Sequence, residues 1–299
     1  MHGWIIIDKP LGLGSTQVVS AVKRACRQAG LGKVKVGHGG TLDPLATGVL
    51  PVALGEATKL AGRMLDSDKI YDFTIRFGEQ TSTLDAEGEV IATSDARPTL
   101  AAVQAALPAF TGPIEQAPPL YSAIKIDGRR AYDLARAGEA VEMKLRSVTI
   151  HGLTIAAGHD APQNALDQIT LTAHVSKGTY IRSLARDIAL ALGTVGHVTM
   201  LRRVKAGPFR LADSISLDNL SDAANERGLE RHMLPLTAGL DDIPALPVSS
   251  EEALMLRQGK VLSGDPCKQG LMLAIEGDLP VALVDALGPE IRVVRGFNL

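Results

Sequence analysis

The residues most able to do chemistry begin with an aspartate in a segment rich in glycine and proline. Residues 37–60 contain five glycines and two prolines, which break regular structure, so we expect a loop across the first half of this segment. Asp43 lies in that loop. A loop can present a carboxylate to a ligand, where it acts as a nucleophile or as a base. Taken by itself, Asp43 could equally be a turn-forming residue before Pro44.

Other kinds of reactive site lack support in the sequence. The two cysteines, Cys26 and Cys267, are far apart, and Cys26 falls on the apolar stripe of an expected helix. The sequence has no GxSxG, HExxH or GxxxxGK[ST] pattern, and its seven histidines are dispersed. We therefore expect no serine or cysteine nucleophile, no metal site and no nucleotide cofactor.

Length and composition indicate a soluble globular protein. The 299 residues can form one large domain, or one domain and a small one of about 60 residues. Hydrophobic residues make up 45% of the chain, without the run of about 20 apolar residues that a membrane span needs. The first residues lack the basic start of a secretory signal, and cysteine is sparse, so we expect a cytoplasmic protein.

Charge is distributed unevenly, although the formal net charge is only −2. Residues 1–63 carry 8 basic and 3 acidic side chains, and residues 170–210 carry 7 and 1. Residues 211–299 are acidic instead, with 7 basic and 14 acidic side chains. The two basic stretches could form one face that binds a polyanion such as nucleic acid, or could be scattered surface charge.

Hydrophobic patterning predicts alternating strands and helices. Runs of apolar residues, or apolar residues that alternate with polar ones, predict the strands. Helix-capping residues and glycines mark the ends of the helices. Two prolines and a change to acidic composition indicate a linker at 236–248. Ser15 or Thr16 is the expected cap of the first helix, and we expect residues 88–92 to form a hairpin with the strand at 71–77. The expected strands are 5–7, 71–77, 88–92, 147–155 and 169–175. The expected helices are 15–29, which Gly30 ends, 100–110, 179–192 and 250–258.

The segment around Asp43 also resembles a family signature. Residues 37–60, GHGGTLDPLATGVLPVALGEATKL, are similar to the motif of the TruB family of tRNA pseudouridine synthases. Five further stretches resemble the same family in the same order: IDKP at 7–10, DKIY at 68–71, PPLYSAIK at 118–125, KGTYIRSL at 177–184 and LRR at 201–203. The resemblance therefore spans about residues 3–210.

The resemblance implies roles for the residues of the site. Asp43 matches the catalytic carboxylate, and Arg182 an arginine that favours the ionised carboxylate and orients it through a two-point fork. Tyr71 matches a tyrosine that stacks on the uracil. Leu201 and Tyr180 match residues that line the base pocket, although each could be an ordinary core residue.

Two further residues and one segment are implied to hold RNA. His38 matches a histidine that enters the T-loop where the target uridine has flipped out, and a hydrogen-bonded loop histidine is the alternative. Lys9 matches a residue that supports the site or contacts phosphate. The basic insertion at about 118–146 matches a segment that grips RNA, although its acidic side chains also fit a purely solvated surface.

The resemblance implies both the architecture and the reaction. We expect an α+β pseudouridine synthase fold over residues 1–240, with a mixed, largely antiparallel sheet and flanking helices. Residues 241–299 should form a small PUA-like β-barrel that binds RNA. The expected reaction converts uridine 55 of the tRNA T-loop to pseudouridine without metal or cofactor, in a protein that is a monomer and has no membrane partner. The alternatives are a non-catalytic RNA-binding protein on the same scaffold and a synthase that works within a guide-RNA particle.

Overall fold

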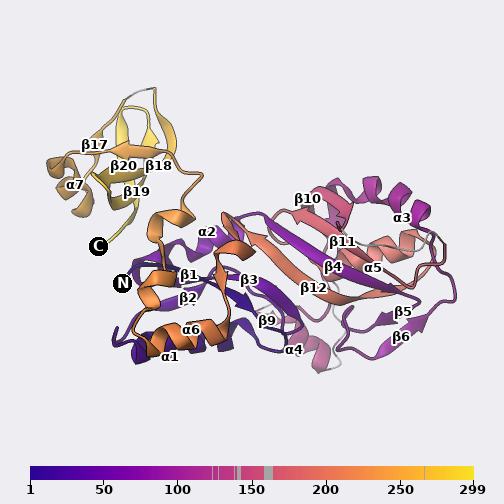
Figure 1. The fold of residues 1–299 in the computed structure, drawn as a ribbon. Helices are drawn as coiled ribbons and strands as arrows, with labels where there is room; N and C mark the ends of the chain where they lie inside the picture. Colours follow the sequence, from indigo (N-terminus) through magenta and orange to yellow (C-terminus); the bar gives the residue numbers. More distant parts are fainter. Residues whose placement is uncertain (123, 127, 138, 140–142, 158–163, 266) are drawn as a thin grey trace.

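The computed structural model describes residues 1–122, 124–126, 128–137, 139, 143–157, 164–265 and 267–299. Figure 1 shows one long twisted sheet with helices packed against it, and a smaller β-rich unit that ends the chain. Within the residues described, none of the helices is both long enough and apolar enough to cross a membrane.

The central sheet has 11 strands, and its main path is β14-β1-β3-β12-β4-β11-β10-β7. Among the described strand pairs of this sheet, β1–β14 and β3–β12 are parallel and the rest are antiparallel, so the expected mixed, largely antiparallel sheet is confirmed. The strands on the path are β1 (Gly3–Lys9), β3 (Ala46–Leu54), β4 (Lys69–Phe77), β7 (Gly112–Gln116), β10 (Arg146–Ile155), β11 (Gln168–Val175), β12 (Gly196–Ala206) and β14 (Ser214–Ile215). The strands off it are β2 (Val36–His38), β13 (Phe209–Arg210) and β15 (Leu234–Pro235).

Some strands of the sheet carry apolar residues on both faces, and helices pack against these parts of the sheet. Ile5 and Ile7 of β1 pack with α1 and α6, whereas Trp4 and Ile6 pack on the opposite face, which explains the unbroken apolar run. Leu184 and Ile188 of α5 pack against β4, β11 and β12. The helices of this unit are α1 (Ser15–Gln28), α2 (Ala61–Asp66), α3 (Leu100–Ala106), α4 (Ala131–Arg136), α5 (Ile181–Ala191) and α6 (Leu217–Asn225), and the short 3-10 helices are η1 (Gly55–Leu60), η2 (Leu107–Phe110), η3 (Leu211–Asp213), η4 (Leu229–His232) and η5 (Leu236–Gly239).

The basic insertion leaves the sheet and returns to it at neighbouring positions. Gln116, the last residue of β7, lies opposite Arg146, the first residue of β10. Between them lie the two-stranded sheet of β8 (Lys125–Ile126) and β9 (Arg129–Arg130), and then α4. Both ends of the insertion are therefore fixed to one strand pair.

The C-terminal unit is a curled five-stranded sheet with one helix, as expected for a PUA-like domain. Its strand order is β16-β18-β19-β20-β17. Its elements are β16 (Ala245–Pro247), α7 (Ser250–Arg257), β17 (Leu262–Ser263), β18 (Gln269–Glu276), β19 (Leu279–Leu287) and β20 (Glu290–Gly296). Leu283 and Phe297 share a buried cluster with Trp4 of β1, so the two units share part of one core. A domain boundary at residue 240 stays a prediction.

Two local expectations are wrong. Ser15 is the first residue inside α1 and does not cap it; Gly14 occupies the cap position, and the Ser15 hydroxyl bonds to Leu42 instead. Residues 88–92 do not pair with β4. The strand there, β6 (Val90–Thr93), pairs with β5 (Glu79–Thr81), because the edges of β4 are taken by β11 and β12.

Candidate active site

A cleft of about 360 Å³ lies between the Asp43 loop, β4, β12 and the start of α5. This volume is within the range of small-molecule sites in proteins. Five of the seven predicted site residues line it, namely Asp43, Tyr71, Tyr180, Arg182 and Leu201. The structure thus brings together residues that are up to 158 positions apart in the sequence.

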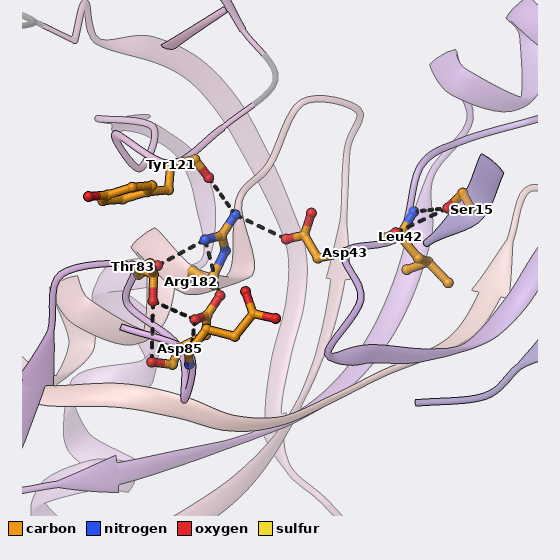
Figure 2. A network of polar contacts seen from close by, with 8 residues as sticks. Ser15, Leu42, Asp43, Thr83, Asp85, Tyr121 and Arg182 are labelled. Atoms are coloured by element: carbon orange, nitrogen blue, oxygen red, sulfur yellow. Dashed lines mark hydrogen bonds and ion pairs between the residues drawn. The ribbon is translucent and has the colours of Figure 1, made fainter. Parts of the chain in front are cut away.

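The loop that carries Asp43 is fixed on both sides of the aspartate. Before it, the Ser15 hydroxyl donates to the Leu42 carbonyl at 3.0 Å and accepts from the Leu42 N–H at 2.8 Å (Figure 2). After it, the Pro44 carbonyl accepts from the Gly12 N–H at 2.9 Å. The Asp43 side chain is 48% exposed and points toward Arg182. The loop therefore presents this carboxylate to the cleft instead of packing it.

Arg182 divides its guanidinium between two carboxylates. One terminal nitrogen lies 3.0 Å from the Asp43 carboxylate and donates to the Tyr121 carbonyl. The other donates to Asp85 at 3.2 Å and to the Thr83 carbonyl at 2.9 Å (Figure 2). The expected ion pair with Asp43 is present, but the expected two-point fork onto that carboxylate is wrong, since the second nitrogen is held by Asp85.

Asp85 was not among the residues predicted from the sequence. It is 9% exposed, and it accepts hydrogen bonds from the Thr83 hydroxyl and the Glu87 N–H as well as from Arg182. A buried cation needs such a partner. Residues 81–89 are mostly small or acidic, as in an ordinary exposed turn, so the sequence carries no signal for this contact.

Tyr71 and Leu201 reach the cleft from adjacent strands. Residues 71 and 73 of β4 lie opposite residues 203 and 201 of β12. On its other edge, Leu201 lies opposite Ala46, three residues after Asp43. Both side chains are half-buried and pack against the cores on either side of the cleft. Together they provide an apolar surface beside the aspartate.

Tyr180 immediately precedes α5 and lies at the cleft wall. Its backbone N–H and carbonyl are both bonded to the side chain of Gln116. Burial raises the pKa of the Tyr180 hydroxyl above its usual value. The neutral phenol is therefore the form present at physiological pH.

The remaining two predicted residues lie outside the cleft lining. The Lys9 side chain is fully buried and donates to the carbonyls of Pro10, Leu13 and Pro44. Burial lowers its pKa to about 8, against an opposing effect of Asp43. All three N–H groups of the Lys9 ammonium are thus bonded to backbone carbonyls, an arrangement suited to supporting the loop that carries Asp43. His38 lies on β2, opposite Val52, and burial lowers its pKa, with Arg203 adding to the effect.

Two further buried cations surround the cleft. Arg203 is 1% exposed and donates to the carbonyls of Val49 and Gly40. Lys69 donates to the carbonyls of Leu65 and Ser67. Both line the cleft, and within the described part of the chain neither lies within ion-pair distance of a carboxylate. A β-carbon at Gly48 would overlap the Arg203 carbonyl, so only glycine fits there. Across the described residues, no group of three or more His, Cys, Asp or Glu side chains could hold a metal ion.

The chain matches two models of one protein family. Residues 27–181 match the N-terminal domain of TruB family pseudouridylate synthases, and residues 182–241 match the tRNA pseudouridylate synthase B C-terminal domain. The chain belongs to the TruB family. The boundary between the two matches falls at Arg182, so the ion pair with Asp43 joins both matched regions.

Relatives and solved structures agree with this assignment. A tRNA pseudouridine synthase B of Novosphingobium aromaticivorans is 62% identical over 299 residues, covering all of this chain and 98% of the relative. One of Zymomonas mobilis is 60% identical over 298 residues, covering all of this chain and 96% of the relative. The crystal structure of a Cbf5-Nop10-Gar1 complex matches with a TM-score of 0.74 and 26% identity, covering 99% of this chain and 85% of that one.

Proposed function

We propose that this protein converts uridine 55 in the T-loop of tRNA to pseudouridine. The observation that carries the proposal is the Asp43–Arg182 ion pair at 3.0 Å, inside a cleft that also holds Tyr71. Membership in the TruB family and full-length relatives named tRNA pseudouridine synthase B support tRNA as the substrate.

The reaction exchanges one glycosidic bond for another. The bond between uracil N1 and ribose C1′ breaks, the base turns, and C5 bonds to C1′. C5 then loses its proton and N1 gains one, so atoms and electrons balance without an added oxidant or group donor. This is why we propose that neither a metal nor a cofactor takes part.

Asp43 starts the reaction in this proposal. In one route its carboxylate attacks C1′ and expels N1, and C5 later displaces the carboxylate from C1′. In the other route it removes the C2′ proton as N1 leaves, which gives a glycal, and it returns that proton to C2′ as C5 bonds to C1′. Arg182 pairs with the carboxylate and directs it into the cleft. A primary kinetic isotope effect with deuterium at C2′ supports the glycal route, and its absence supports the direct attack.

The other residues bind the flipped nucleotide. A uridine within folded RNA must leave its stack before a side chain can reach C1′. Tyr71 stacks on the extruded uracil, while Leu201 and Tyr180 bound its pocket. His38 enters the vacated position in the T-loop, and Lys9 supports the Asp43 loop.

Two outer regions hold the rest of the tRNA. The basic insertion at 118–146 grips the T-arm, and residues 241–299 form a PUA-like domain that contacts the acceptor stem weakly, because this segment is acidic. The protein acts as a monomer in the cytoplasm. A guide RNA is not required.

One assay tests the proposal. Purified protein is incubated with unmodified tRNA in EDTA, without guide RNA or nucleotide, and pseudouridine is mapped at single-nucleotide resolution. We expect one modified site, at the T-loop uridine. A product at another position would overturn the assignment of position 55, and activity that depends on an added guide RNA would favour the guide-dependent alternative.

A further inference from the structure

Gln116 makes an unusual pair of contacts at the base of the insertion. It is 1% exposed. Its side-chain oxygen accepts from the Tyr180 N–H at 2.8 Å, and its side-chain nitrogen donates to the Tyr180 carbonyl at 3.1 Å. The side-chain amide thus bonds to both backbone groups of one residue, as an adjacent β-strand would. Burying an amide is unfavourable unless both of its ends are bonded, and here both are.

The contact continues along the neighbouring residues. The Ala117 carbonyl accepts from the Ser183 hydroxyl at 2.7 Å, and the Tyr121 carbonyl accepts from Arg182 at 3.0 Å. Segment 116–121 therefore contacts the start of α5 at three points. Since Gln116 also pairs with Arg146, the base of the insertion and the start of α5 form one connected unit.

The position of Tyr180 determines where α5 begins. Its carbonyl accepts the N–H of Leu184 at 3.0 Å, a bond of the first helical turn. Arg182 lies in that turn, so a shift of the Tyr180 backbone moves the guanidinium relative to Asp43. Displacements of about 1 Å in a site can reduce a rate ~100-fold.

We propose that Gln116 is a positioning residue for the isomerisation: it fixes the Tyr180 backbone and thereby sets the approach of Arg182 to Asp43. The inference rests on the function proposed above. It assigns to the base of the insertion a role in catalysis that is separate from gripping RNA.

Two substitutions test the role. Gln116→Met keeps the length of the side chain and removes both hydrogen bonds. We expect single-turnover pseudouridine formation at saturating enzyme to fall by about 10- to 100-fold, with the Kd for a T-arm stem-loop changed by less than about threefold, since no RNA contact is removed. Glu115→Gln, exposed on the same strand, is the control and should behave as wild type.

Gln116→Glu adds a pH signature to the test. Because a buried carboxylate also destabilises the fold as the pH rises, the rate is expressed per folded molecule at each pH. The ionised carboxylate would repel the Tyr180 carbonyl, whereas the neutral acid can accept from the N–H and donate to the carbonyl. Burial raises the pKa of such a carboxyl group. We therefore expect the rate of Gln116→Glu relative to wild type to rise as the pH falls from about 8 to about 6, while the ratio for Gln116→Met stays constant.

The outcomes separate this inference from the proposed function. Wild-type protein that forms no pseudouridine contradicts the function itself. Active wild type with an equally active Gln116→Met, or a Gln116→Glu ratio independent of pH, overturns the positioning role. If Gln116→Met fails to fold, the pH dependence of the Gln116→Glu rate per folded molecule still decides the question.

Discussion

Arg182 contacts Asp43 through a single guanidinium nitrogen, 3.0 Å from the carboxylate. Its other terminal nitrogen is held by Asp85 and by the Thr83 carbonyl. The arginine is therefore anchored by groups that do not depend on Asp43. Replacing the aspartate should leave the arginine in place, and this separates binding from catalysis in the experiments below.

Asp43→Asn should abolish catalysis and preserve RNA binding. The amide keeps the size of the side chain but is neither a nucleophile nor a base. We expect single-turnover formation of pseudouridine below about one hundredth of the wild-type rate, equivalent to more than about 3 kcal/mol in the barrier. Filter binding should give an unchanged or tighter Kd, because a negative charge near a polyanion is removed. Asp66→Asn, on the exposed end of α2, is the control, and a rate above that limit would return Asp43 to a turn-forming role.

Arg182→Lys should slow the reaction without preventing binding. A lysine keeps the charge but lacks the planar fork that reaches Asp43, Asp85 and two carbonyls together. We expect a rate reduced by at least ~10-fold with Kd little changed, since orientation is lost and charge is not. Arg210→Lys, at an exposed position, should have no effect. A wild-type rate in Arg182→Lys would show that charge alone suffices.

Asp85→Ala should reduce both stability and rate. Asp85 and Arg182 are 9% and 7% exposed, and removing one partner of a buried pair costs about 3–5 kcal/mol. Urea unfolding should give a lower free energy of unfolding by roughly that amount. The rate should fall further than the folded fraction does, because Arg182 loses the group that aligns it. Unchanged urea unfolding would contradict the inferred anchoring.

Lys69 should make RNA affinity depend on pH. Burial, followed by the nearby Arg203, lowers its pKa to about 8. The side chain is charged below that pH and loses its charge above it, so its contribution to RNA binding should decline as the pH rises from about 7 to about 9. Asp66 and Asp68 act in the opposite direction and raise this pKa, but burial and Arg203 have the larger effect.

Stem-loop binding by Lys69→Met measures this effect. The Kd of the variant divided by that of wild type should exceed one at about pH 7 and approach one at about pH 9. At about pH 7, the slope of log K for RNA binding against log salt concentration should be smaller by about 1 in the variant. Lys260→Met, exposed in the C-terminal unit, should match wild type throughout. If the ratio of the two Kd values does not vary with pH, titration of Lys69 does not contribute to RNA affinity.

Elements with a clear local pattern could be predicted from the sequence. The strands at 71–77, 147–155 and 169–175 appear as β4, β10 and β11 because their apolar residues alternate or run together. The long strand β3 was not predicted, since Gly48 and Pro51 disfavour a strand and only pairing with β1, β2 and β12 stabilises it.

The site residues were predicted through the family motifs, but the residues that hold them in position were not. Asp85 and Gln116 act on residues 97 and 64 positions away. These contacts form only when segments far apart in the sequence are brought together by folding. Hydrophobic periodicity reports local structure and does not predict such contacts. The roles of Lys9 and His38 stay predictions, and Lys9 has the contacts of a supporting residue.

The parallel pairing of β3 with β12 also bears on how the protein is made. Asp43 and Arg182 are 139 residues apart, and synthesis at about 5–20 residues per second separates their appearance by about 7–28 s. During that interval β3 has no β12 beside it, and the Asp43 loop has no arginine. A partly synthesised chain therefore lacks the Asp43–Arg182 pair, and the edge of β3 that binds β12 stays unpaired until residues 196–206 have been made.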